Sequence, residues 1–363
     1  MSASPVLPYT IPSLYCPPVP PRHRHAEEIK HLIDLRFAEY GLRAVPEYAA
    51  AYDSLEMSEL FVRCHPVGDV EALLSIAPFF VIAGLEDKPQ SSEAATHGLP
   101  GMAGQLLRAS ADQVVALVTD PGAEELVADP LAKAFLRANR DLAEFTTAEK
   151  LHLQVTRFLE WITIEHRLTG QETAGYRPPL TEALSDRLTS VALPLIEAFT
   201  AAAFPTLTVE QILQPPAATI WKLVAVAAAA HNDLFSGYAE HDVDSNLVNT
   251  FAREDGISMQ QAAERLADLA DRAMAETQRR LDDLADRRAD PVLVDFAATA
   301  VAHPITAVRW FYPRQMTRRY QVAGLDLTHA AQPLTSTPKA LGAPGITAID
   351  HLWTSAEPVA GTA

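Results

Sequence analysis

The chain has few cysteines for its length. Two of its 363 residues are cysteine, Cys16 and Cys64, and they lie far apart without CxxC spacing. This usage excludes a disulfide framework and a cysteine-based zinc site. Two isolated thiols fit a reducing compartment such as the cytosol.

Positive charge is also scarce. The sequence has 29 Lys and Arg residues against 46 Asp and Glu residues, which gives a formal net charge of −17. Without a basic face, a protein cannot neutralise the phosphates of a nucleic acid or of an anionic membrane over a broad surface. Any anionic ligand must therefore meet a local group of cations.

No segment reads as a signal peptide or as a membrane span. The N-terminal MSASPVLPYTIP lacks a basic region followed by an apolar one, and the apolar run VAVAAAA before His231 is too short to cross a bilayer. We therefore expect a soluble, cytoplasmic protein that contacts neither nucleic acid nor membrane.

Strand-like alternation is missing too, and helical periodicity takes its place. Between Glu27 and Tyr40 apolar residues recur at helical spacing, and Gly41 offers a stop signal. Similar patterns predict helices at about 56–64, 69–86, 103–118, 122–138, 147–168, 180–202, 216–241, 258–288 and 291–309. With 48% hydrophobic residues, rich in Ala and Leu, the chain is expected to be all-α.

The helical region has distinct flanks. Residues 1–22 are proline-rich and predict an extended strap, and 323–363 predict a loose tail or a lid that orders on ligand binding. The helical domain then spans 23–322. Within it, 258–288 opens with the capping box of Ser258 and Gln261 and reads either as half of a coiled coil or, as we prefer, as a long helix packing one stripe on the domain.

One polar face carries candidate chemistry. In AAAAHNDLFSGYAEHD, Asn232, Ser236 and Glu240 recur every four residues on a predicted helix. They span an arc of ~80°, close enough to converge on one cation. Amide, hydroxyl and carboxylate oxygens suit Mg²⁺. An ordinary polar stripe at the end of a helix is the alternative.

This segment resembles the metal-binding NSE motif, (N/D)Dxx(S/T)xxxE, of class I terpene synthases. In that family an arginine upstream, just before a helix break, senses the substrate diphosphate. Arg187, 45 positions before Asn232, fits this role, and Arg177 is a competitor that Pro178 and Pro179 place in a turn.

Two further segments bear on the resemblance. RWFYPRQMTRRY ends in Arg319 and Tyr320, similar to the family's C-terminal RY pair, and Arg318 can share the diphosphate contact. The aspartate-rich motif of the family is less well matched, because Glu86 and Asp87 stand at its two leading positions and Pro89 follows. Ala239 also replaces a lysine that many relatives carry.

The resemblance implies a class I terpenoid synthase α-bundle around a central apolar cavity. It implies Mg²⁺, three ions in all, held by Asn232, Ser236, Glu240, Glu86 and Asp87, and a prenyl diphosphate substrate. The expected cavity aromatics are Phe79, Phe80, Trp310 and Phe311. The Pro-rich strap is also similar to that of the 2-methylisoborneol synthase branch.

The implied activity is ionisation and cyclisation of farnesyl diphosphate to a sesquiterpene, with catalytic roles for Arg187, Arg319 and Tyr320. Geranyl, methylated geranyl and geranylgeranyl diphosphate stay open as substrates, as does homodimerisation. Two other hypotheses are a degenerate homologue that binds an isoprenoid without ionising it, suggested by LEDKPQ, and a helical interaction protein that uses 258–288.

Overall fold

The computed structural model describes residues 9–86, 110–120, 122–238, 243, 245–287, 289–316 and 334–354. The chain divides into two compact units. Unit 1 comprises Met1–Val19, Ile164–Leu193 and Leu213–Ala363, and unit 2 comprises Pro20–Thr163 and Pro194–Ile212. The strap is thus grouped with α12 and α14 in one unit.

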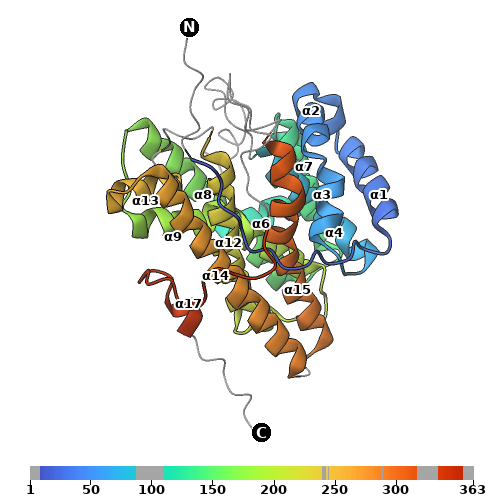
Figure 1. Ribbon diagram of the computed structural model, residues 1–363. Helices are drawn as coiled ribbons and strands as arrows, with labels where there is room; N and C mark the ends of the chain where they lie inside the picture. Colours follow the sequence, from blue (N-terminus) through green and yellow to red (C-terminus); the bar gives the residue numbers. More distant parts are fainter. Residues whose placement is uncertain are drawn as a thin grey trace. The chain divides into compact units, whose positions relative to one another are not determined.

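Both units are built from helices (Figure 1). The elements of unit 2 are α1 (Ala26–Glu39), η1 (Leu42–Ala44), α2 (Pro46–Leu55), α3 (Met57–Cys64), α4 (Val70–Glu86), α6 (Ala111–Thr119), η3 (Ala123–Leu126), α7 (Pro130–Ala143), most of α10 (Leu193–Ala202) and most of α11 (Val209–Leu213). Those of unit 1 are α9 (Leu180–Ser190), α12 (Ala217–Ser236), α13 (Leu247–Asp255), α14 (Met259–Asp286), α15 (Pro291–Thr306), η4 (Ala307–Phe311), α16 (Tyr312–Gln315) and α17 (His351–Thr354). Helix α8 (Ala148–Thr173) runs through both.

Among the described residues the β pairing is confined to a single bridge between Tyr15 and Thr335. The predicted all-α fold is therefore confirmed. Several boundaries differ from the prediction for local reasons. The helix expected at 122–138 starts only at Pro130, because Asp129 accepts the N–H of Ala132 and caps a new helix there. The helices α2 and α13 were not predicted.

Unit 2 has an aromatic core. The rings of Phe135 on α7 and Phe158 on α8 stack with centroids 4.0 Å apart. Phe79 on α4 meets the ring of Phe135 edge-on and stacks at 6.3 Å on Phe199 of α10. These rings join the helices of unit 2 through burial of large apolar surfaces.

Unit 1 is organised around α12, whose residues are almost all buried. Its Ala-rich middle lets α14 and α15 pack closely against it, and Trp221 meets the ring of Phe296 at 5.4 Å. Helix α14 begins with the predicted capping box of Ser258 and Gln261 and turns one stripe toward α12. The preferred interpretation of 258–288, a long helix packed by one stripe, is confirmed.

The described part of the tail differs from the loose segment expected. Thr335 exchanges backbone hydrogen bonds with the strap, donating to Leu14 at 2.9 Å and accepting from Cys16 at 3.1 Å. Asp271 of α14 holds both segments, because its carboxylate accepts the backbone N–H groups of Tyr15 and Lys339. Residues 334–354 are thus fastened to unit 1 by hydrogen bonds.

One helical stretch, Pro291–Gln315, has the length and hydropathy of a membrane span. Of its most apolar window, 61% is buried inside the protein, as in the core helix of a globular fold. This single stretch is weak evidence for a membrane helix.

Candidate functional site

Arg187 is the centre of a polar cluster in unit 1. It lies in the last turn of α9, with 16% of its side chain exposed. Its Nη2 donates to Oδ1 of Asn232 at 2.8 Å and to Oδ1 of Asp233 at 2.5 Å, and its Nε donates to Oδ2 of Asp233 at 3.3 Å. Nη1 donates to the hydroxyl of Ser190 at 2.8 Å. The guanidinium is therefore held in one orientation toward α12.

The helix that carries Arg187 is interrupted shortly after this residue. Helix α9 ends at Ser190 and α10 begins at Leu193, and Ala192 between them has φ +61°. Such a left-handed conformation is unusual for a residue with a Cβ atom and ends the helix. The single helix predicted for 180–202 is thus two helices, with Pro194 in the first turn of the second one. The break lies where the resemblance implied one, just after Arg187.

Asp233 is the residue that sequence reasoning missed. Its side chain is fully buried, and besides Arg187 its Oδ2 accepts the backbone N–H of Leu247, the first residue of α13, at 2.7 Å. A buried carboxylate is stable only when it is paired and hydrogen-bonded in this way. The available signal was an Asp placed shortly after an Ala-rich run and before Leu234 and Phe235, which points to an internal partner.

Asn232 and Ser236 lie on one face of α12, four residues apart. Ser236 is buried, and its hydroxyl lies 3.5 Å from Nδ2 of Asn246, which also donates to the backbone oxygen of Asp233 at 3.2 Å. Amide and hydroxyl oxygens on a shared face are the donor set that fits Mg²⁺. Helix α12 ends at Ser236, short of the predicted end at 241, and Glu240 lies outside the described residues.

Several other predicted site residues lie outside the described part of the chain, namely Asp87, Arg318, Arg319 and Tyr320. Glu86 is the last residue of α4, in unit 2, and only its backbone is described. Arg177 is exposed in the turn before α9, whereas Arg187 contacts Asn232. Their roles in binding stay predictions.

The four predicted cavity aromatics occupy different surroundings. Phe79 belongs to the aromatic core of unit 2, and Phe80 meets the rings of Phe61 and His65 edge-on. In unit 1 the Arg314 guanidinium lies 4.6 Å from the Trp310 ring centroid, and Phe311 meets Tyr312. That these four aromatic residues line a cavity stays a prediction.

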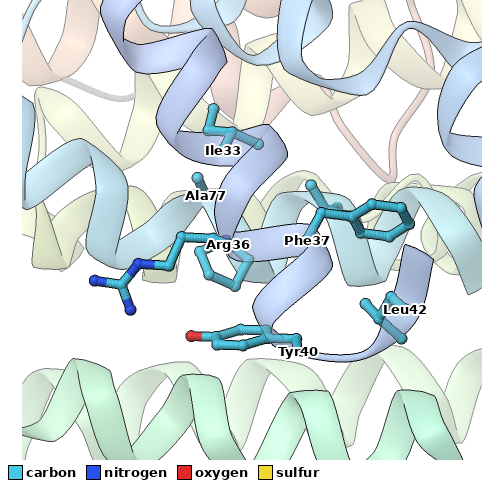
Figure 2. A pocket seen from close by; sticks show the side chains of 8 residues that line it. Ile33, Arg36, Phe37, Tyr40, Leu42 and Ala77 are labelled. Atoms are coloured by element: carbon cyan, nitrogen blue, oxygen red, sulfur yellow. The ribbon is translucent and has the colours of Figure 1, made fainter. Parts of the chain in front are cut away.

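A small pocket on unit 2 is unrelated to these residues. It lies between α1, η1 and α4 and is lined by Ile33, Arg36, Phe37, Tyr40, Leu42, Ala77, Pro78 and Val81 (Figure 2). The hydroxyl of Tyr40 donates to Asp141 at 2.8 Å, and burial raises the pKa of Tyr40. Over the described ranges, no three His, Cys, Asp or Glu side chains gather as a metal cluster.

Residues 104–276 match the family model described as terpene synthase family 2, C-terminal metal binding. The matched segment contains Arg187, Asn232, Asp233 and Ser236. The match covers just under half of the chain, and this part resembles the metal-binding domain of that family.

Solved structures with a similar fold include a reconstructed ancestral protein and a synthase. The ancestral protein SVS_A2 is 20% identical, with a TM-score of 0.72 over 95% of this chain and 98% of that chain. Hedycaryol synthase in complex with nerolidol is 19% identical, with a TM-score of 0.64 over 83% of this chain and 100% of that one. At this identity the likeness shows the fold, and no curated protein sequence matches.

Proposed function

We propose that this terpene synthase ionises a prenyl diphosphate in an Mg²⁺-dependent reaction and cyclises the resulting allylic cation, with release of diphosphate. The observation that carries the proposal is the orientation of Arg187 against Asn232 and Asp233. Arginine is suited to the recognition of diphosphate, and this orientation brings Arg187 to the face of α12 that carries the oxygen donors.

The charge balance of the chain supports this assignment. A protein with a net charge of −17 must supply cations at the point where an anionic substrate binds. Arg187 is such a cation, and Asp233 fixes its plane from the buried side. Asn232 and Ser236 would hold Mg²⁺, with Glu240 as the third proposed ligand. When bound, Mg²⁺ neutralises the diphosphate and acts as a Lewis acid on it.

The chain's own residues then have distinct tasks. Arg187 donates hydrogen bonds to the diphosphate, and Arg319 and Tyr320 are proposed to do the same. The bond between the allylic carbon and the diphosphate oxygen breaks, and its electron pair leaves with that oxygen. Apolar and aromatic side chains keep water from the cation and stabilise its positive charge.

Farnesyl diphosphate is the proposed substrate and a sesquiterpene the proposed product. Hedycaryol synthase, whose fold this chain shares, binds nerolidol, a sesquiterpenoid alcohol. The proposal includes three Mg²⁺ ions, for which Glu86 and Asp87 would be further ligands.

The test is to incubate the purified protein separately with geranyl, methylated geranyl, farnesyl and geranylgeranyl diphosphate, with Mg²⁺ or with EDTA. Released diphosphate and extracted hydrocarbons are measured. We expect a cyclic product from farnesyl diphosphate that EDTA abolishes. Asn232→Ala should lose the activity, whereas Asn249→Ala, an asparagine of α13 bonded to the backbone oxygen of Val243, should keep it.

The same assay separates the degenerate alternative, which the Glu86 and Asp87 positions motivate. Folded protein that binds farnesyl diphosphate but releases no diphosphate from any of the four substrates would refute the catalytic proposal and support binding without ionisation.

A further inference from the structure

The N-terminal strap, residues 9–19, reaches the turn of α12 that carries the proposed metal ligands. The strap runs along unit 1 as the dark blue segment of Figure 1, and its apolar side chains are buried. Tyr9 is 3% exposed and lies at the C-terminal end of α12. Residues more than 200 positions apart therefore meet at the metal motif.

Tyr9 closes the last turn of α12. Its hydroxyl donates to the backbone oxygen of Leu234 at 2.8 Å and lies 3.4 Å from that of Asp233. The final carbonyl groups of a helix have few partners within it. That of Asp233 also accepts the N–H of Gly237 at 3.1 Å, whereas the Tyr9 hydroxyl supplies the donor for that of Leu234. Both carbonyls belong to residues between Asn232 and Ser236, the two described oxygen donors.

Two residues that follow Ser236 contact Tyr9. The ring of Tyr9 stacks on Tyr238 with centroids 4.9 Å apart, and the Tyr238 hydroxyl donates to the backbone oxygen of Tyr9 at 2.9 Å. At Gly237 a Cβ atom would lie 2.3 Å from the Tyr9 hydroxyl, so only glycine lets the strap approach this closely. Gly237 and Tyr238, both in the segment NDLFSGYAE, are thus in close contact with the strap.

The strap is fastened independently of Tyr9. Its backbone N–H at Tyr15 donates to Asp271 at 2.7 Å, and Arg309 donates to the backbone oxygens of Cys16 and Pro17 at 2.9 and 3.1 Å. These anchors on α14 and η4 fix where the strap runs. Tyr9 is therefore presented to α12 from a framework that does not depend on the metal site.

We propose that Tyr9 is a positioning residue for the metal site, which holds the last turn of α12 so that Asn232 and Ser236 present their oxygens together. The inference rests on the proposed function, because it needs a cation at those oxygens. Loss of one hydrogen bond at this turn corresponds to about a three- to tenfold weaker binding of metal.

The test uses Mn²⁺ as a spectroscopic probe, with free ion measured by electron paramagnetic resonance in the presence of inorganic diphosphate. Tyr9→Phe removes the hydroxyl and keeps the ring that stacks on Tyr238. Tyr15→Phe is the matched control, the same substitution in the same strap at a residue held through its backbone. We expect Tyr9→Phe to bind Mn²⁺ about three- to tenfold more weakly and Tyr15→Phe to match the wild type.

Thermal unfolding of the same samples distinguishes positioning from simple support of the fold. If Tyr9→Phe lowers the unfolding temperature but binds Mn²⁺ as the wild type does, the inference is wrong and the proposed function stands. If the wild type itself binds no Mn²⁺, with or without diphosphate, the proposed metal site fails and the inference fails with it.

Discussion

Arg187 donates a hydrogen bond from Nη2 to the amide oxygen of Asn232, at 2.8 Å. The same oxygen is the proposed ligand of a divalent cation. A cation and a guanidinium group repel each other at such a distance, so both cannot hold this oxygen equally well. In the proposed function, diphosphate would offer Arg187 a more strongly charged acceptor and leave the amide oxygen to the metal.

The first prediction is therefore that metal and diphosphate bind cooperatively. Inorganic diphosphate should tighten Mn²⁺ binding to the wild type by about tenfold, a usual size for such coupling. In Arg187→Ala the metal should bind more tightly in the absence of diphosphate, and the coupling should shrink. Titration calorimetry with each ligand, alone and with the other present, measures both effects.

Arg167→Ala is the control for this experiment. Arg167 pairs with Asp186 on α9, the residue directly before Arg187, and does not contact Asn232. It should keep the wild-type coupling. Undiminished coupling in Arg187→Ala would show that Arg187 does not compete with the metal for Asn232.

The second prediction concerns the buried carboxylate of Asp233. Asp233→Asn keeps the size of the side chain but removes the charge that pairs with Arg187. Breaking a buried pair on one side leaves the other charge uncompensated, so the free energy of unfolding should fall by about 3 kcal/mol. Urea denaturation followed by circular dichroism gives this value.

A surface pair provides the comparison for Asp233. Asp255→Asn removes the partner of Arg265, whose side chain is 50% exposed, and should cost less than about 1 kcal/mol. Equal losses in the two variants would mean that burial does not strengthen the pair of Asp233 and Arg187.

The third prediction uses two glycines. In Gly237→Ala the new Cβ would meet the Tyr9 hydroxyl at 2.3 Å and the Asp233 backbone oxygen at 2.9 Å, so the free energy of unfolding should fall by about 1 to 3 kcal/mol. Gly170→Ala places a Cβ in open space on α8 and should raise stability by up to about 1 kcal/mol. Opposite signs in thermal unfolding confirm the close approach of the strap, and a stabilising Gly237→Ala contradicts it.

The fourth prediction concerns acid stability through His65. This side chain is 1% exposed, and burial lowers its pKa from 6.5 to about 4. Between these values the unfolded chain binds the proton and the folded chain does not, so stability falls as the pH drops from about 6.5 to 4, by up to about 3 kcal/mol. Urea denaturation at pH 7 and pH 4.5 measures the loss.

His65→Gln should remove the part of this pH dependence that His65 contributes, since glutamine does not titrate and its amide can still donate to the backbone oxygen of Phe61, as Nδ1 of His65 does at 2.9 Å. His231, whose pKa burial lowers to about 3, should keep its own part. The exposed His166→Gln should keep it. An unchanged pH dependence in His65→Gln would assign the acid loss to other groups.

Much of the fold could be predicted from short stretches of sequence. The capping box of Ser258 and Gln261 and the apolar stripe after it depend only on neighbours within a few positions, and the structure has both. The same holds for Asn232 and Ser236, whose shared face follows from helical spacing. The predicted end of that helix at 241 was wrong, because α12 ends at Ser236, where Tyr9 and Asn246 donate to the carbonyl groups of its last turn.

The left-handed conformation of Ala192 and the role of Asp233 could not be predicted in this way. Ala192 adopts its left-handed conformation without a local residue preference for it, so the surrounding packing imposes it. Asp233 acquires its partners from α9 and α13, and no spacing rule within α12 names them.

The sequence by itself determined the helical class, the helix caps, the shortage of cations and the oxygen donors on one face of α12, because each depends on local spacing or on composition. Only the tertiary structure decided that Arg187 turns to Asn232 from 45 positions away and that Tyr9 meets Leu234 from 225 positions away. Such contacts depend on how whole helices pack, and packing is set by the combined shape and volume of many side chains at once.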